Sequence, residues 1–403
     1  MSRTPILSGI KVVDFTHIVA GPHCTRLMAE QGAEVIKIEP LTGDPIRTLP
    51  FHKEGRSACF IQHNIGKMSM AMDISTPEAR EILYQLIKDA DVVVENFAPG
   101  VMKRHKLDWE TLSKLNPDLI MCSISCFGQT GPLAEQPGYD FIGQSYAGVL
   151  DMNGEPDGNP IFPDLAFGDV STGAHAYGAI VAALFHKFRG HGGQYIDISL
   201  VDVLFSYHEM AVELYDGSGE QIVLKRQGAH HALVAPLGIY PCADRHLFII
   251  ASRDSWVRLV KLIGRPDLLE DPRCAEPMAR NKNRDLVNAA IQKWLDDIDD
   301  ADEAIERLHE HRVPAAPILS IPEVMSHPHI VARGTVRNIP DPVFGQIRIP
   351  NNPLRFSQFP EPLDIQAGFL GDANHAILKE RLNYTDHQIE DLENRGIITS
   401  KRI

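Results

Sequence analysis

Two short hydrophobic stretches near the start of the chain, Lys11-Val-Val-Asp-Phe15 and Glu34-Val-Ile-Lys-Ile38, decide the fold class. Both are rich in β-branched residues and predict buried parallel strands. Between them, Pro22 suits the first turn of a helix that runs to about Gln31, where Gly32 ends it. Strand, helix and strand form a βαβ unit, which predicts an α/β protein with a Rossmann-like, doubly wound parallel sheet.

The rest of the chain continues this alternation of strands and helices up to about residue 216, and its pattern then changes. Helices and loops alternate with further predicted strands at 68–72, 91–95, 119–123 and 195–198. A polar linker, a predicted strand at 247–251 and a group of helices follow. We therefore expect a large domain formed by residues 1–216 and 331–403, and a smaller α+β domain formed by residues 217–330.

Composition and charge exclude several classes of protein. The chain has 403 residues, 44% of them hydrophobic, and a formal net charge of −14, which argues against a nucleic-acid or anionic-membrane partner. No apolar run approaches the roughly 20 residues of a membrane span. Met1–Pro5 lead directly into a predicted strand without the apolar segment of a signal peptide. We expect a cytoplasmic protein with reduced cysteines and, since neither His230-His231 nor His327-Pro328-His329 has further ligands at zinc-site spacing, no metal site.

A carboxylate between small residues is the first candidate for chemistry. Asp169 lies in Gly168-Asp-Val-Ser-Thr-Gly173 and precedes an apolar run, Ile180–Leu184, that predicts a buried helix. Ser171 or Thr172 is a suitable helix cap, which places Asp169 just ahead of the N-terminus. Free amides and the helix dipole there favour an ionised, exposed carboxylate, able to act as a nucleophile. The alternative is that Asp169 only caps the helix.

Two loops follow predicted strands at the edge where open α/β sheets bind ligands. The turn Thr16–Pro22 contains only Gly21 and lacks the GxGxxG pattern, so it predicts neither a nicotinamide nor a flavin cofactor. Its backbone N–H groups nevertheless suit a phosphate or an acyl oxygen. Asn96–Gly100 follows the strand at 91–95, and the basic pair Lys103 and Arg104 directly after it suits a phosphate, although a solvated charged face is the simpler interpretation.

The order and spacing of several segments together resemble the class III (CaiB/BaiF) CoA-transferase family over nearly the whole chain. The matching segments are Gly9–His17 with Ala20-Gly21-Pro22, Gly32–Pro40, Asn64–Lys67, Glu95–Gly100, Ser125–Pro132, Pro137–Asp140, and Asp169 with Gly173.

This resemblance implies an interlocked homodimer of two-domain subunits that uses acyl-CoA and small carboxylic acids as substrates. It implies that Asp169 is a nucleophile that forms an aspartyl-CoA thioester, with Tyr139 and Asp140 beside it. Oxyanion donors are expected at the turn after the first strand and at the start of the Asp169 helix. The implied contacts with CoA are His17, Ile18, Val19, Ala20, Met72, Asn96, Phe97 and Arg104.

The acid substrates are less well defined by the residues. Candidates to bind a substrate carboxylate are His230, His231, Arg47 and Arg56. Formyl-CoA:oxalate transferases carry a glutamine where this chain has Val19, an arginine where it has Pro40, and a glycine run that is absent here, so formate–oxalate exchange is not expected. From the family's usual substrates we expect succinyl-CoA as donor and a dicarboxylate or hydroxy acid as acceptor.

Three other functions remain as alternatives. An α-methylacyl-CoA racemase needs an acid/base pair, and relatives of that kind have a histidine where this chain has Tyr139. An ordinary tyrosine, with a pKa of about 10, is a poor base at neutral pH, which favours the transferase. A non-catalytic CoA-binding protein would not need Asp169. A nicotinamide dehydrogenase lacks support because the glycine pattern is missing.

Overall fold

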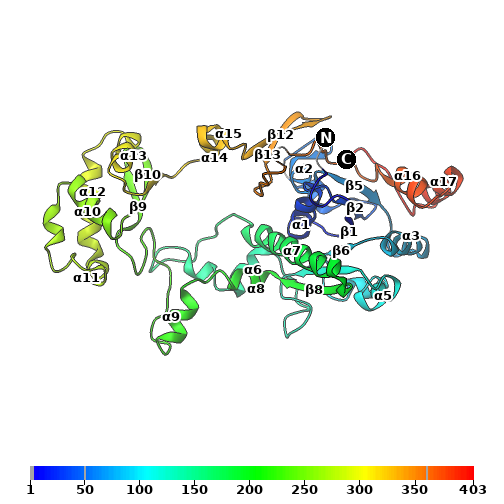
Figure 1. Ribbon diagram of the computed structural model, residues 1–403, viewed down its shortest axis with the longest axis horizontal. Coiled ribbons are helices and arrows are strands. Elements are labelled where there is room, and N and C mark those ends of the chain that lie inside the picture. Colours follow the sequence, from blue (N-terminus) through cyan, green and yellow to red (C-terminus); the bar gives the residue numbers. More distant parts are fainter. Residues whose placement is uncertain (1–3, 50, 360–361) are drawn as a thin grey trace. The chain divides into compact units, whose positions relative to one another are not determined.

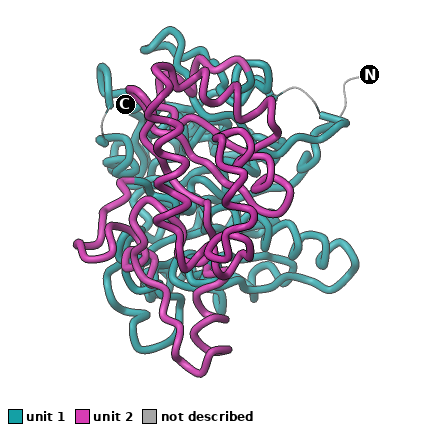
Figure 2. The backbone as a smooth tube through the Cα atoms, turned by 90° about the vertical axis from the view of Figure 1, so that its left-hand side faces the viewer, with its two compact units in different colours: residues 1–147, 165–207, 329–403 teal, residues 148–164, 208–328 magenta. Residues whose placement is uncertain are grey.

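The computed structural model describes residues 4–49, 51–359 and 362–403. Met1–Arg3, part of the N-terminal stretch considered above, lie outside the described residues. The chain forms two compact units (Figure 2): the first contains Met1–Ala147, Leu165–Tyr207 and His329–Ile403, and the second contains Gly148–Asp164 and His208–Pro328. The second unit thus starts at His208 rather than at residue 217, and it includes residues 148–164, which the sequence analysis assigned to the large domain.

A six-stranded parallel sheet organises the first unit (Figure 1). In spatial order its strands are β5 (Lys67–Ala71), β2 (Glu34–Glu39), β1 (Lys11–Asp14), β6 (Val92–Glu95), β7 (Ile120–Ser125) and β8 (Gln194–Ser199). This confirms the predicted α/β class with a parallel sheet, and the strand order is that of Rossmann-type sheets. Because the order reverses between β1 and β6, the loops that follow these two strands diverge and leave a crevice at the carboxyl edge.

Helices cover this sheet and connect its strands. They are α1 (Ala20–Ala29), α2 (Ala58–Asn64), α3 (Pro77–Lys88), α4 (Val101–Arg104), α5 (Trp109–Leu115), α6 (Asp140–Tyr146), α7 (Phe167–His186), α8 (Leu200–Phe205), α15 (Pro328–Ala332), α16 (Asn374–Ala376) and α17 (Asp386–Asn394). Shorter elements are η1 (Pro45–Thr48), η3 (Lys187–His191), η5 (Ile377–Arg381), β3 (His52–Lys53), β4 (Arg56–Ser57), β12 (Val336–Asp341) and β13 (Gly345–Pro350).

Local sequence signals explain several of these helices. The Thr76 hydroxyl accepts a hydrogen bond from Ala79 N–H at the start of α3, where Pro77 occupies the first turn, as the sequence predicts. The buried face of α3, with Ile82 and Leu83, packs in one core cluster with Val13 of β1 and Val93 of β6. This burial fixes the strands whose ends form the crevice.

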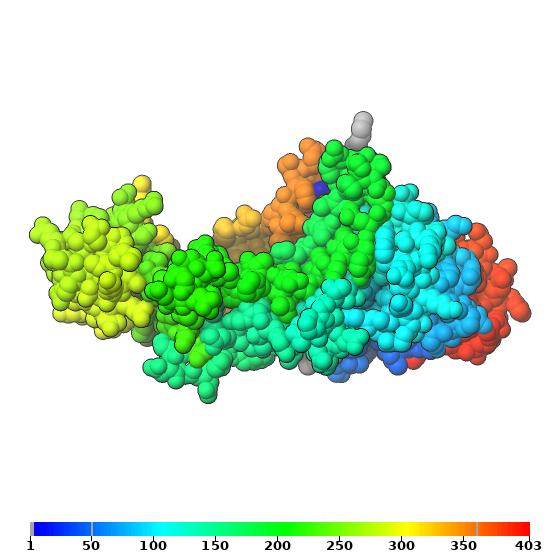
Figure 3. Space-filling model, turned by 90° about the horizontal axis from the view of Figure 1, so that it is seen from below, coloured from blue at the N-terminus to red at the C-terminus, as the bar shows by residue number. Residues whose placement is uncertain are grey.

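Helix α7 differs from its prediction as a buried helix. Ile180, Ala183 and Leu184 are buried, but Phe185 in α7 and Phe188 in η3 are 64% and 67% exposed. In the space-filling view, green residues of the α7 region form part of the surface next to cyan residues of the 100–130 range (Figure 3). Within the run Ile180–Leu184 itself, Val181 is half-buried and Ala182 is exposed, so this chain buries α7 only in part.

The second unit has its own sheet and core. Strands β11 (Ala315–Pro317), β10 (Arg245–Ile250) and β9 (Leu237–Cys242) form an antiparallel sheet in that order. Its remaining elements are η2 (Leu150–Met152), α9 (Ala211–Gly217), α10 (Asp254–Leu262), η4 (Pro266–Leu269), α11 (Pro277–Lys282), α12 (Arg284–Asp296), α13 (Ala301–Glu310) and α14 (Ile321–Ser326).

Two further observations concern the helices. The stretch Leu200–Tyr215, which the sequence favours as a single helix, is not continuous: α8 ends at Phe205, and α9 starts only after the chain has passed into the second unit. Within the described part of the chain, none of the helices combines the length and the apolar content needed to cross a membrane.

Candidate active site

A cleft of about 440 Å³ opens at the carboxyl edge of the sheet, between the loops that follow β1 and β6. It brings together most of the residues that the sequence analysis singled out: Asp169, Tyr139, His17, Ile18, Val19, Ala20, Asn96 and Phe97. Tyr139 is 75% exposed at this cleft. All of these residues belong to the first unit.

The cleft also contains residues that were not predicted as site residues, among them Ser125, Cys126 and Gln136. Ser125 is the last residue of β7, and Cys126 directly follows it. Their position at the carboxyl edge of the sheet is the sequence signal that could have identified them as site residues. Burial, together with the charges of Asp169 and Asp140, raises the pKa of Cys126 to about 11. Cys126 is therefore an uncharged thiol that contributes packing rather than a nucleophile.

Asp169 occupies a different position on its helix from the one predicted. Helix α7 starts at Phe167, so Asp169 lies within its first turn and not ahead of its N-terminus. Ser171 and Thr172 lie inside the helix and do not cap it, and the Ser171 hydroxyl instead donates to the Gly168 carbonyl over 3.2 Å.

The cap comes from a distant segment. Asp140 Oδ2 accepts a hydrogen bond of 2.5 Å from the Asp169 N–H, and Gln144 Nε2 donates to Asp140 Oδ1. Asp140 is almost fully buried. Its carboxylate thus satisfies a free amide of the first turn of α7 and fixes the backbone of Asp169.

The close crossing of α7 and α1 fixes the location of the Asp169 side chain. A Cβ atom at Gly173 would lie 2.4 Å from the carbonyl oxygen of Ala20 and 3.1 Å from His23 Cβ, so only glycine permits this approach. Asp169 lies one helical turn before Gly173. The first turn of α7 is therefore held next to the N-terminus of α1.

The Asp169 carboxyl is not the strongly ionised group that the helix position predicted. Burial, and then the negative charge of Asp140, raise the pKa of Asp169 to about 7. Shifts of this kind occur at functional sites, where a carboxylate with little solvation is a better nucleophile than one in water.

This raised pKa predicts a pH dependence. If Asp169 reacts as the carboxylate, kcat/KM for CoA transfer falls about tenfold for each pH unit below 7 and is constant above it. Asp140→Asn keeps a side-chain oxygen for the Asp169 N–H but removes the charge, so the midpoint of the profile is expected to move to lower pH. Initial rates between pH 5 and pH 9 measure both profiles, and coincident profiles would contradict the assigned role of the Asp140 charge.

The same shift predicts a stability effect of opposite sign. A carboxyl whose pKa is higher in the folded than in the unfolded state destabilises the folded protein at pH values above its unfolded pKa. The penalty develops between about pH 4 and pH 7 and is complete above that range. Because Asp169 is partly exposed, we expect Asp169→Asn to stabilise the protein by about 1–2 kcal/mol at pH 8. Thermal unfolding should show a higher Tm at pH 8 and little change near pH 4.5.

Opposite Asp169, the turn after β1 presents free backbone donors. Val19 precedes α1 without a side-chain cap, and the N–H groups of Val19, Ala20 and Gly21 have no hydrogen-bond partner within the described residues. Amides at a helix N-terminus point out of the helix and attract negative charge. Val19 and Ala20 line the cleft, so this end of α1 is suited to an oxyanion.

A neighbouring cavity of about 360 Å³ extends the site. It shares His17 and Phe97 with the cleft, and it contains Met72, another of the predicted CoA contacts. The rings of His17 and Phe97 pack edge to face with centroids 5.0 Å apart. Burial and the charge of Lys37 lower the pKa of His17, so this side chain is neutral at pH 7.

Three predicted arginines do not line the cleft or this cavity. Arg104 is exposed on the short helix α4. Arg47 is buried, pairs with Glu39 through two of its nitrogens, and donates a third hydrogen bond to the Ile403 carbonyl. Arg56 is buried against Asp341 and two backbone carbonyls. The interpretation of Arg47 and Arg56 as substrate ligands is therefore wrong, because both guanidinium groups are engaged within the fold.

His230 and His231 belong to the second unit. The His230 ring packs edge to face against Tyr240, and burial, followed by the charge of Arg284, lowers its pKa. The His231 Nδ1 accepts a hydrogen bond from Leu233 N–H over 3.1 Å. A role of these two histidines towards the acid substrate stays a prediction.

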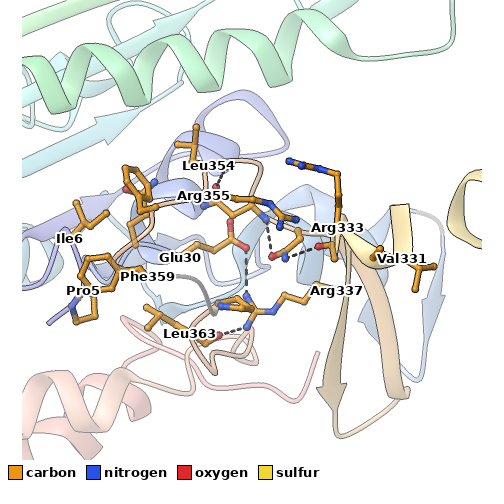
Figure 4. Close-up of a pocket in the computed structure, with 17 residues that line it drawn as sticks. Pro5, Ile6, Glu30, Val331, Arg333, Arg337, Leu354, Arg355, Phe359 and Leu363 are labelled. Carbon is orange, nitrogen blue, oxygen red and sulfur yellow. Dashed lines mark hydrogen bonds and ion pairs between the residues drawn. The ribbon is translucent and has the colours of Figure 1, made fainter. Parts of the chain in front are cut away.

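A separate cavity of about 350 Å³ in the first unit contains none of the predicted site residues (Figure 4). Two of its charged groups are engaged within the fold: Glu30 Oε1 lies 3.2 Å from Arg26 Nη2 and 3.8 Å from Arg337 Nη1, and Arg337 donates to the Leu363 carbonyl. The cleft with Asp169 is therefore the better candidate for catalysis.

Fold and site together define an α/β protein with a cleft at the carboxyl edge of a Rossmann-type sheet, lined by a partly desolvated carboxyl group. The chain belongs to CoA-transferase family III, whose family model matches residues 7–372. It is accordingly an enzyme of the CoA-transferase class, and enzymes of this family use CoA thioesters as substrates.

Individual relatives agree with this assignment over the length of the chain. The chain is 33% identical over 396 residues to the succinyl-CoA–D-citramalate CoA-transferase of Chloroflexus aurantiacus, which covers 97% of this chain and 98% of the relative. It is 36% identical over 346 residues to the succinate–glutarate CoA-transferase of Agrobacterium fabrum, covering 83% of this chain and 85% of the relative. The crystal structure of a CaiB/BaiF family protein from Brucella suis covers 94% of this chain and 100% of its own, with 35% identity and a TM-score of 0.82.

Proposed function

We propose that this enzyme moves CoA from succinyl-CoA, or a similar donor, to a second carboxylic acid through a thioester formed on Asp169. The observation that carries the proposal is the meeting of a partly desolvated carboxyl group and an uncapped helix N-terminus in one cleft. The first supplies a nucleophile and the second supplies donors for an oxyanion.

The chemistry proceeds by exchange at two carbonyl carbons. The Asp169 carboxylate attacks the thioester carbonyl, the carbon–sulfur bond breaks, and CoA leaves as a thiolate from a mixed anhydride. The thiolate then attacks the Asp169 carbonyl and displaces the donor acid as its carboxylate, which leaves the aspartyl-CoA thioester. The acceptor carboxylate reverses these two steps. Each tetrahedral intermediate carries an oxyanion that the free amides at Val19 and Ala20 are suited to bind.

The residues around Asp169 take supporting roles in this proposal. Asp140 caps the first turn of α7 and orients the nucleophile rather than exchanging protons with substrate. Tyr139 borders the open side of the cleft. His17, Phe97 and Met72 extend from the cleft into the neighbouring cavity, where the remainder of CoA binds.

The acids exchanged are proposed from chemistry shared with the relatives. The relatives named above act on succinate or succinyl-CoA together with D-citramalate or glutarate, which are dicarboxylic acids. We therefore propose a dicarboxylate or hydroxy dicarboxylate as acceptor. We also propose the interlocked homodimer that the resemblance implies, since Phe185 and Phe188 leave apolar surface exposed on a single chain.

Intact-protein mass spectrometry after mixing with a panel of acyl-CoAs, without an acceptor acid, tests this function. We expect a covalent adduct with the mass of CoA less one water, strongest with succinyl-CoA and removed by hydroxylamine. If no acyl-CoA gives an adduct, the covalent route is wrong. Deuterium exchange at the α-carbon of a branched acyl-CoA would then indicate a racemase instead. Activity restricted to monocarboxylic thioesters would contradict the proposed donor.

A further inference from the structure

The turn between β1 and α1 contains an unusual backbone conformation at the cleft. Ile18 has a φ of +67°, in the left-handed region. This region is disfavoured for residues with a branched Cβ, by about 1–2 kcal/mol. Ile18 lines the cleft directly before Val19 and Ala20, whose N–H groups have no partner within the described residues. The orientation of these donors therefore depends on whatever holds Ile18 in place.

Side chains from three other parts of the first unit anchor three consecutive residues of this turn. Lys37 Nζ donates to the Thr16 carbonyl over 2.6 Å. Asn96 Oδ1 accepts from His17 N–H over 2.7 Å, and Asn96 Nδ2 donates to the His17 carbonyl over 2.8 Å. The strained residue itself is held by Asp44, whose Oδ1 accepts from Ile18 N–H over 3.1 Å.

Two of these anchors form an ion pair that is removed from solvent. Lys37 Nζ lies 2.9 Å from Asp44 Oδ2, and both side chains are completely buried. Asp44 also accepts from Ile46 N–H over 3.0 Å, which fixes its carboxylate at the start of η1. A buried ion pair of this kind resists separation, because breaking it would leave an uncompensated charge.

We propose that Asn96 and the Lys37–Asp44 pair are positioning residues that hold Ile18 in its left-handed conformation and thereby aim the amides of Val19 and Ala20 at the acyl oxygen. The inference rests on the proposed function, since it assigns a task to the oxyanion donors of that site. It also changes the role of Asn96: both polar ends of its side chain are bonded to His17, so Asn96 acts through the turn and not through a direct polar contact with CoA.

The variant Asn96→Ala tests the proposal through a separation of rate and binding. The rate constant for formation of the CoA adduct at saturating succinyl-CoA should fall by about ten- to a hundredfold, because misplaced oxyanion donors act on the transition state. The Kd for free CoA, which has no acyl oxygen, should change by less than about threefold. A loss of CoA binding as large as the loss of rate would overturn the positioning role.

A matched control separates positioning from general stability. Asn116 is also half-buried, and its Nδ2 brackets a turn by donating to the carbonyls of Ile87 and Ala90 over 3.0 and 2.8 Å. Asn116→Ala should lower the Tm to an extent similar to Asn96→Ala but leave the rate constant for adduct formation unchanged. Equal rates for the two variants would overturn the proposal.

A double-mutant cycle with Ile18→Gly supplies the sharper test. Glycine adopts positive φ without strain, so the turn needs less restraint in that background. Asn96→Ala should therefore reduce the rate of adduct formation several-fold less in the Gly-substituted protein than in the wild type. Equal reductions in both backgrounds would show that Asn96 does not act by restraining Ile18.

Failure of this inference and failure of the proposed function give different results. If wild-type protein forms no hydroxylamine-labile adduct, the covalent function is wrong, whatever the variants do. Crystal structures of wild type and Asn96→Ala test the restraint without turnover, since the inference expects φ of residue 18 to become negative in the variant. A normal adduct in the wild type with a positive φ retained in the variant would overturn the restraint alone.

Discussion

Replacing Asp169 with alanine is expected to lower kcat for CoA transfer by more than about a thousandfold, since Asp169 forms the covalent intermediate of the proposed reaction. The hydroxylamine-labile CoA adduct should disappear as well. Binding of free CoA should remain within a few-fold of wild type, because the cavity with Met72 and Phe97 is unaltered. Steady-state transfer rates, adduct mass and CoA titration measure the three quantities.

A surface aspartate of the same unit provides the control for this experiment. Asp118 is exposed, and its Asp118→Ala variant should behave like wild type in all three measurements. Transfer retained in Asp169→Ala at more than a few per cent would mean that Asp169 is not the nucleophile. A lost adduct with retained transfer would favour direct exchange without a covalent enzyme.

The second large effect is expected from a single methyl group added where α7 crosses α1. Gly173→Ala places a Cβ atom 2.4 Å from the Ala20 carbonyl oxygen, so α7 and α1 must separate. The separation moves Asp169 away from the amides of Val19 and Ala20, and displacements near 1 Å reduce rates about a hundredfold. We therefore expect kcat to fall by about that factor and the free energy of unfolding to fall by about 1–3 kcal/mol.

Another glycine of the same helix separates local packing from helix propensity. A Cβ atom at Gly178 meets nothing within 4 Å, so Gly178→Ala should stabilise α7 by up to about 1 kcal/mol without loss of kcat. Activity assays and thermal unfolding of both variants provide the comparison. If both variants retain wild-type kcat, the close crossing does not set the position of Asp169.

The sheet could be predicted from sequence because the signals for its strands lie within the strands themselves. The runs at Lys11–Asp14 and Val92–Glu95 are β-branched and buried, and Thr76-Pro77 marks a helix start that the structure confirms. The boundary of α7 could not be predicted in this way. Its capping carboxylate, Asp140, lies 29 residues earlier in the chain, so no nearby residue indicates where the helix begins.

The same limit explains the incorrect roles of the two arginines. Arg47 follows a polar loop and has the charge expected of a carboxylate ligand, but Glu39 and the carbonyl of Ile403 engage it. Arg56 pairs with Asp341, 285 positions away. Charge patterning identifies a cation but not its partner when that partner is distant in sequence. The raised pKa of Asp169 has a similar origin, because burial and Asp140 both arise from tertiary contacts.

The α1–α7 crossing at Gly173 joins the proposed nucleophile, Asp169, and the proposed oxyanion donors at Val19 and Ala20 in a single rigid unit. At this crossing the backbone of α7 approaches the carbonyl oxygen of Ala20 so closely that no Cβ atom fits at Gly173. Substitutions elsewhere can therefore change the space for the acid substrate while the position of Asp169 relative to the amides of Val19 and Ala20 stays the same. In this chain, therefore, the choice of acid can change through the residues that line the cleft without any change at the crossing.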